Sequence, residues 1–100
     1  DVAGALDDLS RRYQAHMAEV ADQLAALLDA PDSRAEIAGL SHGVAGTAGS
    51  LGFPEASTAA FQAEAVAKAG DAASAKELRT AVEGLIQALR VSAGTMSSDT

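Results

Sequence analysis

Apolar side chains in the first thirty residues recur at every third or fourth position. This spacing places them on one side of an α-helix, which turns once in about 3.6 residues, and it does not suit a strand. The stripe consists of Leu6, Leu9, Tyr13, Met17, Val20, Leu24 and Leu27. We therefore predict a long amphipathic helix that ends near Asp29, where Ala30-Pro31-Asp32 stops it. The residues before Leu6 are compatible with a short separate helix.

The second predicted helix has a start signal and a stop signal. Ser33 and Glu36 fit a capping box, in which the serine oxygen accepts from a helix amide and the glutamate reaches back. Gly52 suits the position just after the helix ends. Pro54 suits the first turn of the following helix, so only a tight corner separates the two. These two helices are therefore expected to form an antiparallel hairpin.

The third and fourth helices follow with one short connection. The third continues to about Gly70, and Asp71 fits the N-cap of the fourth. The apolar stripe of the fourth helix consists of Ala75, Leu78, Val82, Leu85, Ile86 and Leu89. From Val91 onward the chain becomes small and polar, which favours a frayed tail. We predict an all-α, antiparallel up-down four-helix bundle over residues 1–92 with a flexible tail at 93–100.

Composition and charge narrow the class of protein. One hundred residues make one domain, and 48% hydrophobic residues with only 3% aromatic ones favour thin, closely packed helices. The absence of cysteine excludes disulfides and cysteine nucleophiles and suits a cytoplasmic protein. A net charge of −7 with seven scattered basic residues argues against nucleic-acid binding. No apolar stretch approaches the roughly 18–20 residues of a membrane span, so no membrane insertion is expected.

His42 stands in the glycine-rich run LSHGVAGTAGSLG, residues 40–52. On a helix, its neighbours all have side chains no larger than a methyl group: Ala38, Gly39, Ala45, Gly46 and Gly49. The apolar residues fall on the opposite side: Ile37, Leu40, Val44 and Leu51. The imidazole is therefore expected to project alone from a bare face that another protein can approach.

The glycines of this run weaken the helix that carries His42. An interior glycine costs about 0.8–1 kcal/mol relative to alanine, so Gly39, Gly43, Gly46 and Gly49 together cost roughly 3–4 kcal/mol. Small domains have only about 5–15 kcal/mol of net stability. A glycine-rich loop, or close packing of a neighbouring helix, would also account for the composition. The unbroken apolar stripe behind the glycines favours an exposed helical site, because a loop has no cause to keep such a stripe.

A solitary exposed histidine can act as a metal ligand, a general base or a nucleophile. No His, Asp or Glu lies three or four residues from His42, so no metal site is expected. A general base would need an enclosed pocket and a partner group. The other histidine, His16, is expected to be half-buried near Tyr13 and Val20. The remaining chemistry for His42 is nucleophilic: the ring accepts a group from one large partner and yields it to another.

The segment His42-Gly43-Val44-Ala45-Gly46-Thr47, followed by Leu51-Gly52, resembles the histidine-phosphotransfer (HPt) domains of two-component phosphorelays. The family pattern is His, any residue, an aliphatic, usually Lys or Arg, Gly, then Ser, Thr or Ala, with Leu-Gly closing the helix. In its helix order the resemblance extends over nearly the whole chain. It implies that His42 is the residue that becomes phosphorylated.

The resemblance also assigns supporting roles. It implies that Gly46 gives a partner receiver domain room to reach the histidine. Glu64 matches the family position where Gln or Glu hydrogen-bonds the far imidazole nitrogen and fixes the tautomer; without the resemblance it would pass for an ordinary solvated glutamate. The chain departs from the family at Ala45, where a Lys or Arg usually steadies the phosphoryl charge. Lys68, one turn beyond Glu64, is a candidate substitute, and a plain Glu64–Lys68 surface pair is the alternative.

The partners implied by the resemblance are receiver domains and a sensor or hybrid histidine kinase. The receiver brings the aspartate and Mg²⁺, so we expect no cofactor and no autonomous kinase activity in this chain, which we expect to be a monomer. Two other interpretations stay open. The chain can be the phosphoryl-accepting domain of a larger hybrid or chemotaxis-type kinase, or a non-catalytic helical adaptor whose glycine face docks a partner helix.

Overall fold

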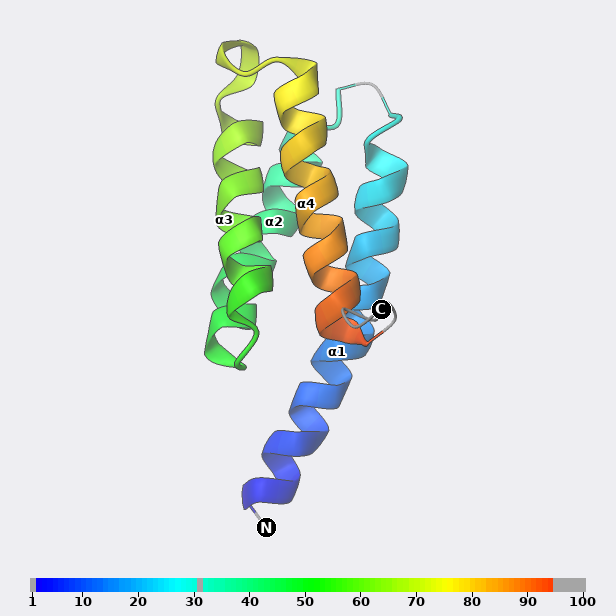
Figure 1. The fold of residues 1–100 in the computed structure, drawn as a ribbon, viewed down its shortest axis with the longest axis vertical. Coiled ribbons are helices and arrows are strands. Elements are labelled where there is room, and N and C mark those ends of the chain that lie inside the picture. The colour runs from blue at the N-terminus through cyan, green and yellow to red at the C-terminus, as the bar shows by residue number, and fades with distance from the viewer. Residues whose placement is uncertain (1, 31, 95–100) are drawn as a thin grey trace.

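The computed structural model describes residues 2–30 and 32–94, without the side chains of residues 3 and 6. Its elements are α1 (Val2–Leu27), α2 (Arg34–Ser50), α3 (Pro54–Lys68), the short 3₁₀ turn η1 (Gly70–Ala72) and α4 (Ala75–Ala93). Successive α-helices run in opposite directions (Figure 1), which confirms the predicted all-α four-helix bundle. Within these described ranges, none of the helices is both long enough and apolar enough to cross a membrane.

The four helices enclose one apolar core. Helix α2 packs along α3, α3 along α4 and α4 along α1, while α1 meets α2 over a smaller area. The largest fully buried apolar side chains are Met17, Val20, Leu24, Ile37, Val44, Val82, Leu85 and Leu89. Fully buried alanines line the seam between α2 and α3: Ala48, Ala56, Ala60 and Ala63. Because a methyl group needs little space, these two helices lie close together, and polar side chains at the edge of the seam can reach across it.

Helix α1 is one continuous helix from Val2, so the structure has no separate short helix before Leu6 in the residues that it describes. Its first turns extend past the end of the bundle (Figure 1). Leu9, predicted in the core stripe, is 48% exposed, and the side chain of Leu6 lies outside the described residues. The prediction for Leu9 is wrong because this part of α1 has fewer helices to pack against.

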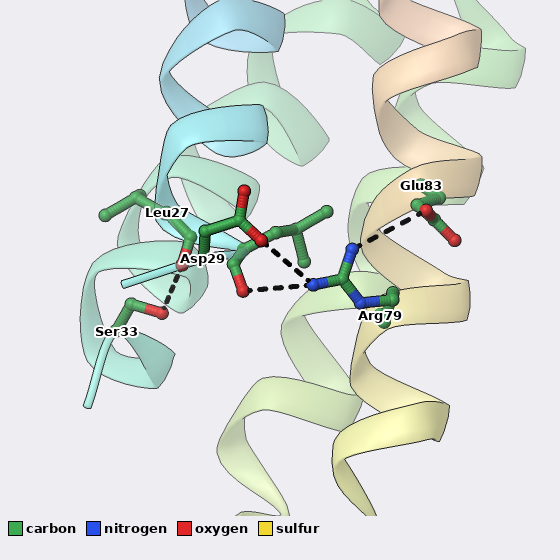
Figure 2. Close-up of polar contacts among 6 residues, drawn as sticks. Leu27, Asp29, Ser33, Arg79 and Glu83 are labelled. Atoms are coloured by element: carbon green, nitrogen blue, oxygen red, sulfur yellow. Dashed lines mark hydrogen bonds and ion pairs between the residues drawn. The ribbon is translucent and has the colours of Figure 1, made fainter. Parts of the chain in front are cut away.

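Hydrogen bonds to the carbonyls at the end of α1 and just after it hold the connection to α2 (Figure 2). The Ser33 hydroxyl donates to the Leu27 carbonyl at 2.8 Å. From α4, Arg79 donates to the Leu28 carbonyl at 3.4 Å. The predicted capping box of Ser33 and Glu36 is therefore wrong, since the Ser33 side chain makes no cap hydrogen bond. The end of α1 leaves carbonyls without helical donors, and the serine satisfies one of them.

The corner between α2 and α3 has the predicted form. Gly52 adopts a left-handed backbone with φ of 89°, which favours glycine. The Phe53 amide then donates to the Ala48 carbonyl at 2.9 Å, as in a Schellman motif. Pro54 lies in the first turn of α3, where its missing N–H costs nothing. This tight corner fixes α2 and α3 as an antiparallel hairpin.

The start of α4 differs from the prediction. Asp71 lies in η1, four residues before α4 begins at Ala75, and does not cap it. Ser74 is the N-cap: its hydroxyl accepts from the Glu77 amide at 3.0 Å, and Glu77 accepts from the Ser74 amide at 3.3 Å. Ser74 and Glu77 therefore form a capping box at the start of α4, whereas the box predicted for Ser33 and Glu36 at α2 does not form.

The end of α4 also differs. The prediction that the chain frays from Val91 is wrong. Helix α4 continues through Ala93, and Gly94 ends it in a left-handed conformation. The Gln14 side chain of α1 donates to the Ser92 carbonyl at 3.0 Å and fastens this last turn to the bundle. The rest of the predicted tail, residues 95–100, lies outside the described residues.

Candidate functional site

His42 lies on the outer side of α2, at the edge of the seam with α3. Its side chain is 76% exposed. The ring Nδ1 is 2.9 Å from Oε2 of Glu64 on α3, so the structure brings together the two residues that the sequence analysis pairs. Among the described residues, Nε2 has no hydrogen-bond partner. The two ring nitrogens therefore have different environments, one held by the protein and one open to solvent.

The Glu64 carboxylate determines which nitrogen of His42 carries the proton. Its side chain is only 10% exposed, and an ionised carboxylate accepts hydrogen bonds without donating them. Nδ1 must then be the donor in this pair. In the neutral ring the lone pair lies on Nε2. The site thus presents an unprotonated nitrogen outward, as a nucleophile requires.

Lys68 contacts the same carboxylate oxygen as His42. Its Nζ lies 2.7 Å from Oε2 of Glu64, one turn earlier on α3. The Lys68 hydrogen bond is the largest cause that lowers the pKa of Glu64; burial opposes it, and the His42 hydrogen bond adds to it. Glu64 therefore stays ionised and accepting at neutral pH. The structure therefore shows the Glu64–Lys68 surface pair, which was the alternative to Lys68 standing in for the family's usual Lys or Arg.

Three glycines on the outer side of α2 have no packing role. A Cβ placed on Gly39, Gly43 or Gly46 would meet no atom within 4 Å. Gly84 on α4 is equally unconstrained, so open space by itself does not mark a site. The three glycines of α2 differ from it in lying along the helix that carries His42. They leave the surface beside the imidazole without side chains.

Ala45 faces α3, and Gly49, although exposed, lies next to α3. A Cβ on Gly49 would lie 3.1 Å from the Ser57 hydroxyl, which donates to the Ala45 carbonyl at 2.7 Å. Gly49 therefore permits close packing of the two helices. The prediction that Ala45 belongs to the exposed surroundings of His42 is wrong, because Ala45 is only 3% exposed. The spacing of residues along one helix shows which of them share a side, but it does not show which side the neighbouring helix covers.

Replacing Gly39, Gly43 and Gly46 together by alanine is expected to stabilise the protein by roughly 2–3 kcal/mol, because each alanine gains about 0.8–1 kcal/mol of helix propensity. Urea unfolding measures this free energy. The matched control is Gly49→Ala, where contact with Ser57 should cancel most of the gain. A loss of stability in the triple variant would contradict the described environment of these glycines.

The second histidine does not form a comparable site. His16 was predicted to be half-buried, but it is exposed on α1, because the adjacent Met17 takes the inward position. Its ring centroid lies 5.7 Å from that of Tyr13. Among the described residues, no group of three or more His, Asp or Glu side chains is placed to hold a metal ion.

Acid is expected to remove the stabilisation that ionised Glu64 provides. Because the pKa of Glu64 is lowered from 4.5 in the folded chain, this contribution is present above the unfolded value and is lost as the pH falls through the folded one. The difference in unfolding free energy between wild type and Glu64→Gln should therefore shrink from about pH 6 to about pH 3. Glu19→Gln, at an exposed glutamate of α1, controls for the lost charge. A difference that does not change with pH would contradict the lowered pKa.

The site is therefore an exposed imidazole, held at one nitrogen by a buried carboxylate, on the side of a four-helix bundle. The chain belongs to the Hpt domain family, whose model matches residues 8–92. This family takes part in phosphotransfer in two-component signalling and interacts with receiver domains and histidine kinases. Comparison with curated proteins and with solved structures gave no significant match.

Proposed function

We propose that His42 accepts a phosphoryl group on Nε2 and exchanges it with the aspartate of a receiver domain. The observation that carries this proposal is the 2.9 Å contact between Nδ1 and Glu64, beneath a ring that is 76% exposed. That contact fixes the proton on the inner nitrogen and leaves the outer one free to react. We expect the exchange to take place in the cytoplasm, which the absence of cysteine suits.

This geometry supports the following transfer step. The Nε2 lone pair attacks the phosphorus of the receiver's aspartyl phosphate, and the Nε2–P bond forms as the P–O bond to the aspartate breaks. The electron pair of that bond leaves with the aspartate carboxylate. Nδ1 keeps its proton, and the positive charge that the ring gains lies beside the Glu64 carboxylate. The reverse step returns the phosphoryl group to the receiver.

Positioning and charge stabilisation supply most of the catalysis in such a loose, in-line transition state. Glu64 positions the ring, and Lys68 supports Glu64 through the 2.7 Å contact. Gly46, one turn after His42, leaves room for the partner's aspartate. Since Ala45 is buried and carries no charge, the receiver and its Mg²⁺ are expected to stabilise the phosphoryl group. The mechanism is the same whether the chain is a free carrier or a domain of a larger kinase.

A transfer assay with the wild-type chain tests this function. Purified receiver domains are phosphorylated with labelled acetyl phosphate, separated from the donor and mixed with the chain. We expect a label on the chain that is labile in acid and stable in alkali, as a phosphorylated imidazole is. A label with the opposite stability would contradict the proposal. Absence of label with every receiver from the source genome would also contradict it and would favour the helical adaptor.

A further inference from the structure

Two large apolar side chains near the site remain exposed. Phe61 on α3 is 59% exposed, and Leu9 on α1 is 48% exposed. Isolated exposed apolar residues are common on soluble proteins and need no explanation by themselves. What matters here is where these two residues lie relative to His42.

Phe61 lies beside the seam between α3 and α2. It follows Ser57 by four residues and precedes Glu64 by three, and residues at these spacings share one side of a helix. Both flanking residues contact α2: the Ser57 hydroxyl at the Ala45 carbonyl, and Glu64 at His42. The exposed aromatic ring is therefore about one helical turn, roughly 5.4 Å, from the residue that holds the imidazole.

Leu9 lies on the other side of α2. A hollow of about 450 Å³ between α1 and α2 is lined in part by Leu9, Tyr13 and Gly46. Gly46 is one turn after His42, and its Cα faces open space. An apolar side chain thus lies on each side of the part of α2 where Gly43 and Gly46 leave open space beside His42.

We propose that Leu9, His42, Gly46 and Phe61 form a docking face for the receiver domain, with Phe61 as its apolar anchor. This inference rests on the proposed function. In-line transfer requires the partner's reacting atom to come within about 3–3.5 Å of Nε2. A protein interface buries about 800 Å² on each partner, a patch of roughly 16 Å in radius. A receiver centred on His42 therefore covers Phe61, and aromatic residues near the centre of an interface contribute most of the binding energy.

A second copy of this chain fits the face less well. Two identical chains each carry a net charge of −7, which opposes their association. Pairing through this face would also set His42 against His42 and offer no aspartate to either ring. The receiver is the occupant that satisfies both the chemistry of the nucleophile and the apolar character of its surroundings.

The test uses the receiver that labels the wild-type chain fastest. A second donor, phosphoramidate, transfers its phosphoryl group to Nε2 as ammonia leaves and is too small to need a docking face. For Phe61→Ala, we expect the ratio of receiver-driven to phosphoramidate-driven labelling to fall about tenfold, through a higher KM for the receiver. Leu9→Ala should act in the same direction, and Phe61→Leu should restore most of the ratio. Val2→Ala, which truncates an exposed apolar residue at the far start of α1, is the matched control.

Three results would overturn the docking face. In the first, both donors label Phe61→Ala and Leu9→Ala at wild-type rates. In the second, labelling by both donors slows equally in Phe61→Ala, which would mean that Phe61 shapes the imidazole itself. Alternatively, sedimentation would detect a wild-type dimer that Phe61→Ala dissociates while the ratio is unchanged, which would assign the face to a second copy. Failure of the proposed function is distinguishable from all three, because then no receiver labels the wild-type chain.

Discussion

The His42→Ala variant is expected to take up no phosphoryl group from a receiver, whereas His16→Ala still takes it up. The two histidines are a matched pair, since both rings are exposed on outer helix surfaces. They differ in that Nδ1 of His42 is held by Glu64 at 2.9 Å, while His16 contacts the ring of Tyr13. Only His42 therefore has its proton fixed on one nitrogen and its lone pair directed to solvent.

Acid-labile label on each variant measures this difference, with circular dichroism to verify that both remain helical. Equal labelling of His42→Ala and wild type would end the proposal that His42 is the acceptor. Loss of label in His16→Ala, with the helices intact, would mean that the wrong histidine has been assigned.

The Glu64→Ala variant is expected to transfer phosphate about 100-fold more slowly than wild type. Without the carboxylate, the proton is no longer fixed on Nδ1 and the ring turns freely, and a misplacement of about 1 Å can cost a factor of this size. The loss of the fixed tautomer can be measured separately from the rate. The ¹⁵N NMR spectrum of the imidazole should show a mixture of both tautomers in place of the Nδ1-protonated form.

Glu64→Gln separates positioning from charge. The amide oxygen still accepts a hydrogen bond from Nδ1, so this variant should keep the wild-type tautomer and lose less of the rate than Glu64→Ala. Glu19→Ala, at an exposed glutamate on α1, controls for the removal of a carboxylate elsewhere. An unchanged tautomer in Glu64→Ala would mean that the two side chains do not interact in solution.

The fold was predictable because its signals are local. Apolar spacing predicts each helix, and Gly52 with Pro54 predicts the corner between α2 and α3. The roles of Ser33 and Asp71 were not predictable in the same way. A serine before a helix can cap that helix or bond to another carbonyl that comes near, and here the turn between α1 and α2 brings the Leu27 carbonyl to Ser33.

The site, like the fold, has features that the local sequence predicts and features that it does not. The exposure of His42 follows from its helix alone, but its pairing with Glu64 came from a family resemblance, because no spacing within one chain segment reveals which residue faces it across a seam. The burial of Ala45 was missed for that reason. Phe61 was also missed, although its position three residues before Glu64 would have placed it beside the site once that pairing was assumed.

The position of phosphorus on the imidazole tests the central claim most directly. The chain is labelled with ¹⁵N, phosphorylated by the receiver and studied by ¹H–¹⁵N–³¹P correlation NMR. We predict that the phosphorus couples to Nε2 of His42 while Nδ1 keeps its proton against Glu64. Phosphorus on Nδ1, or on any other residue, would contradict the account.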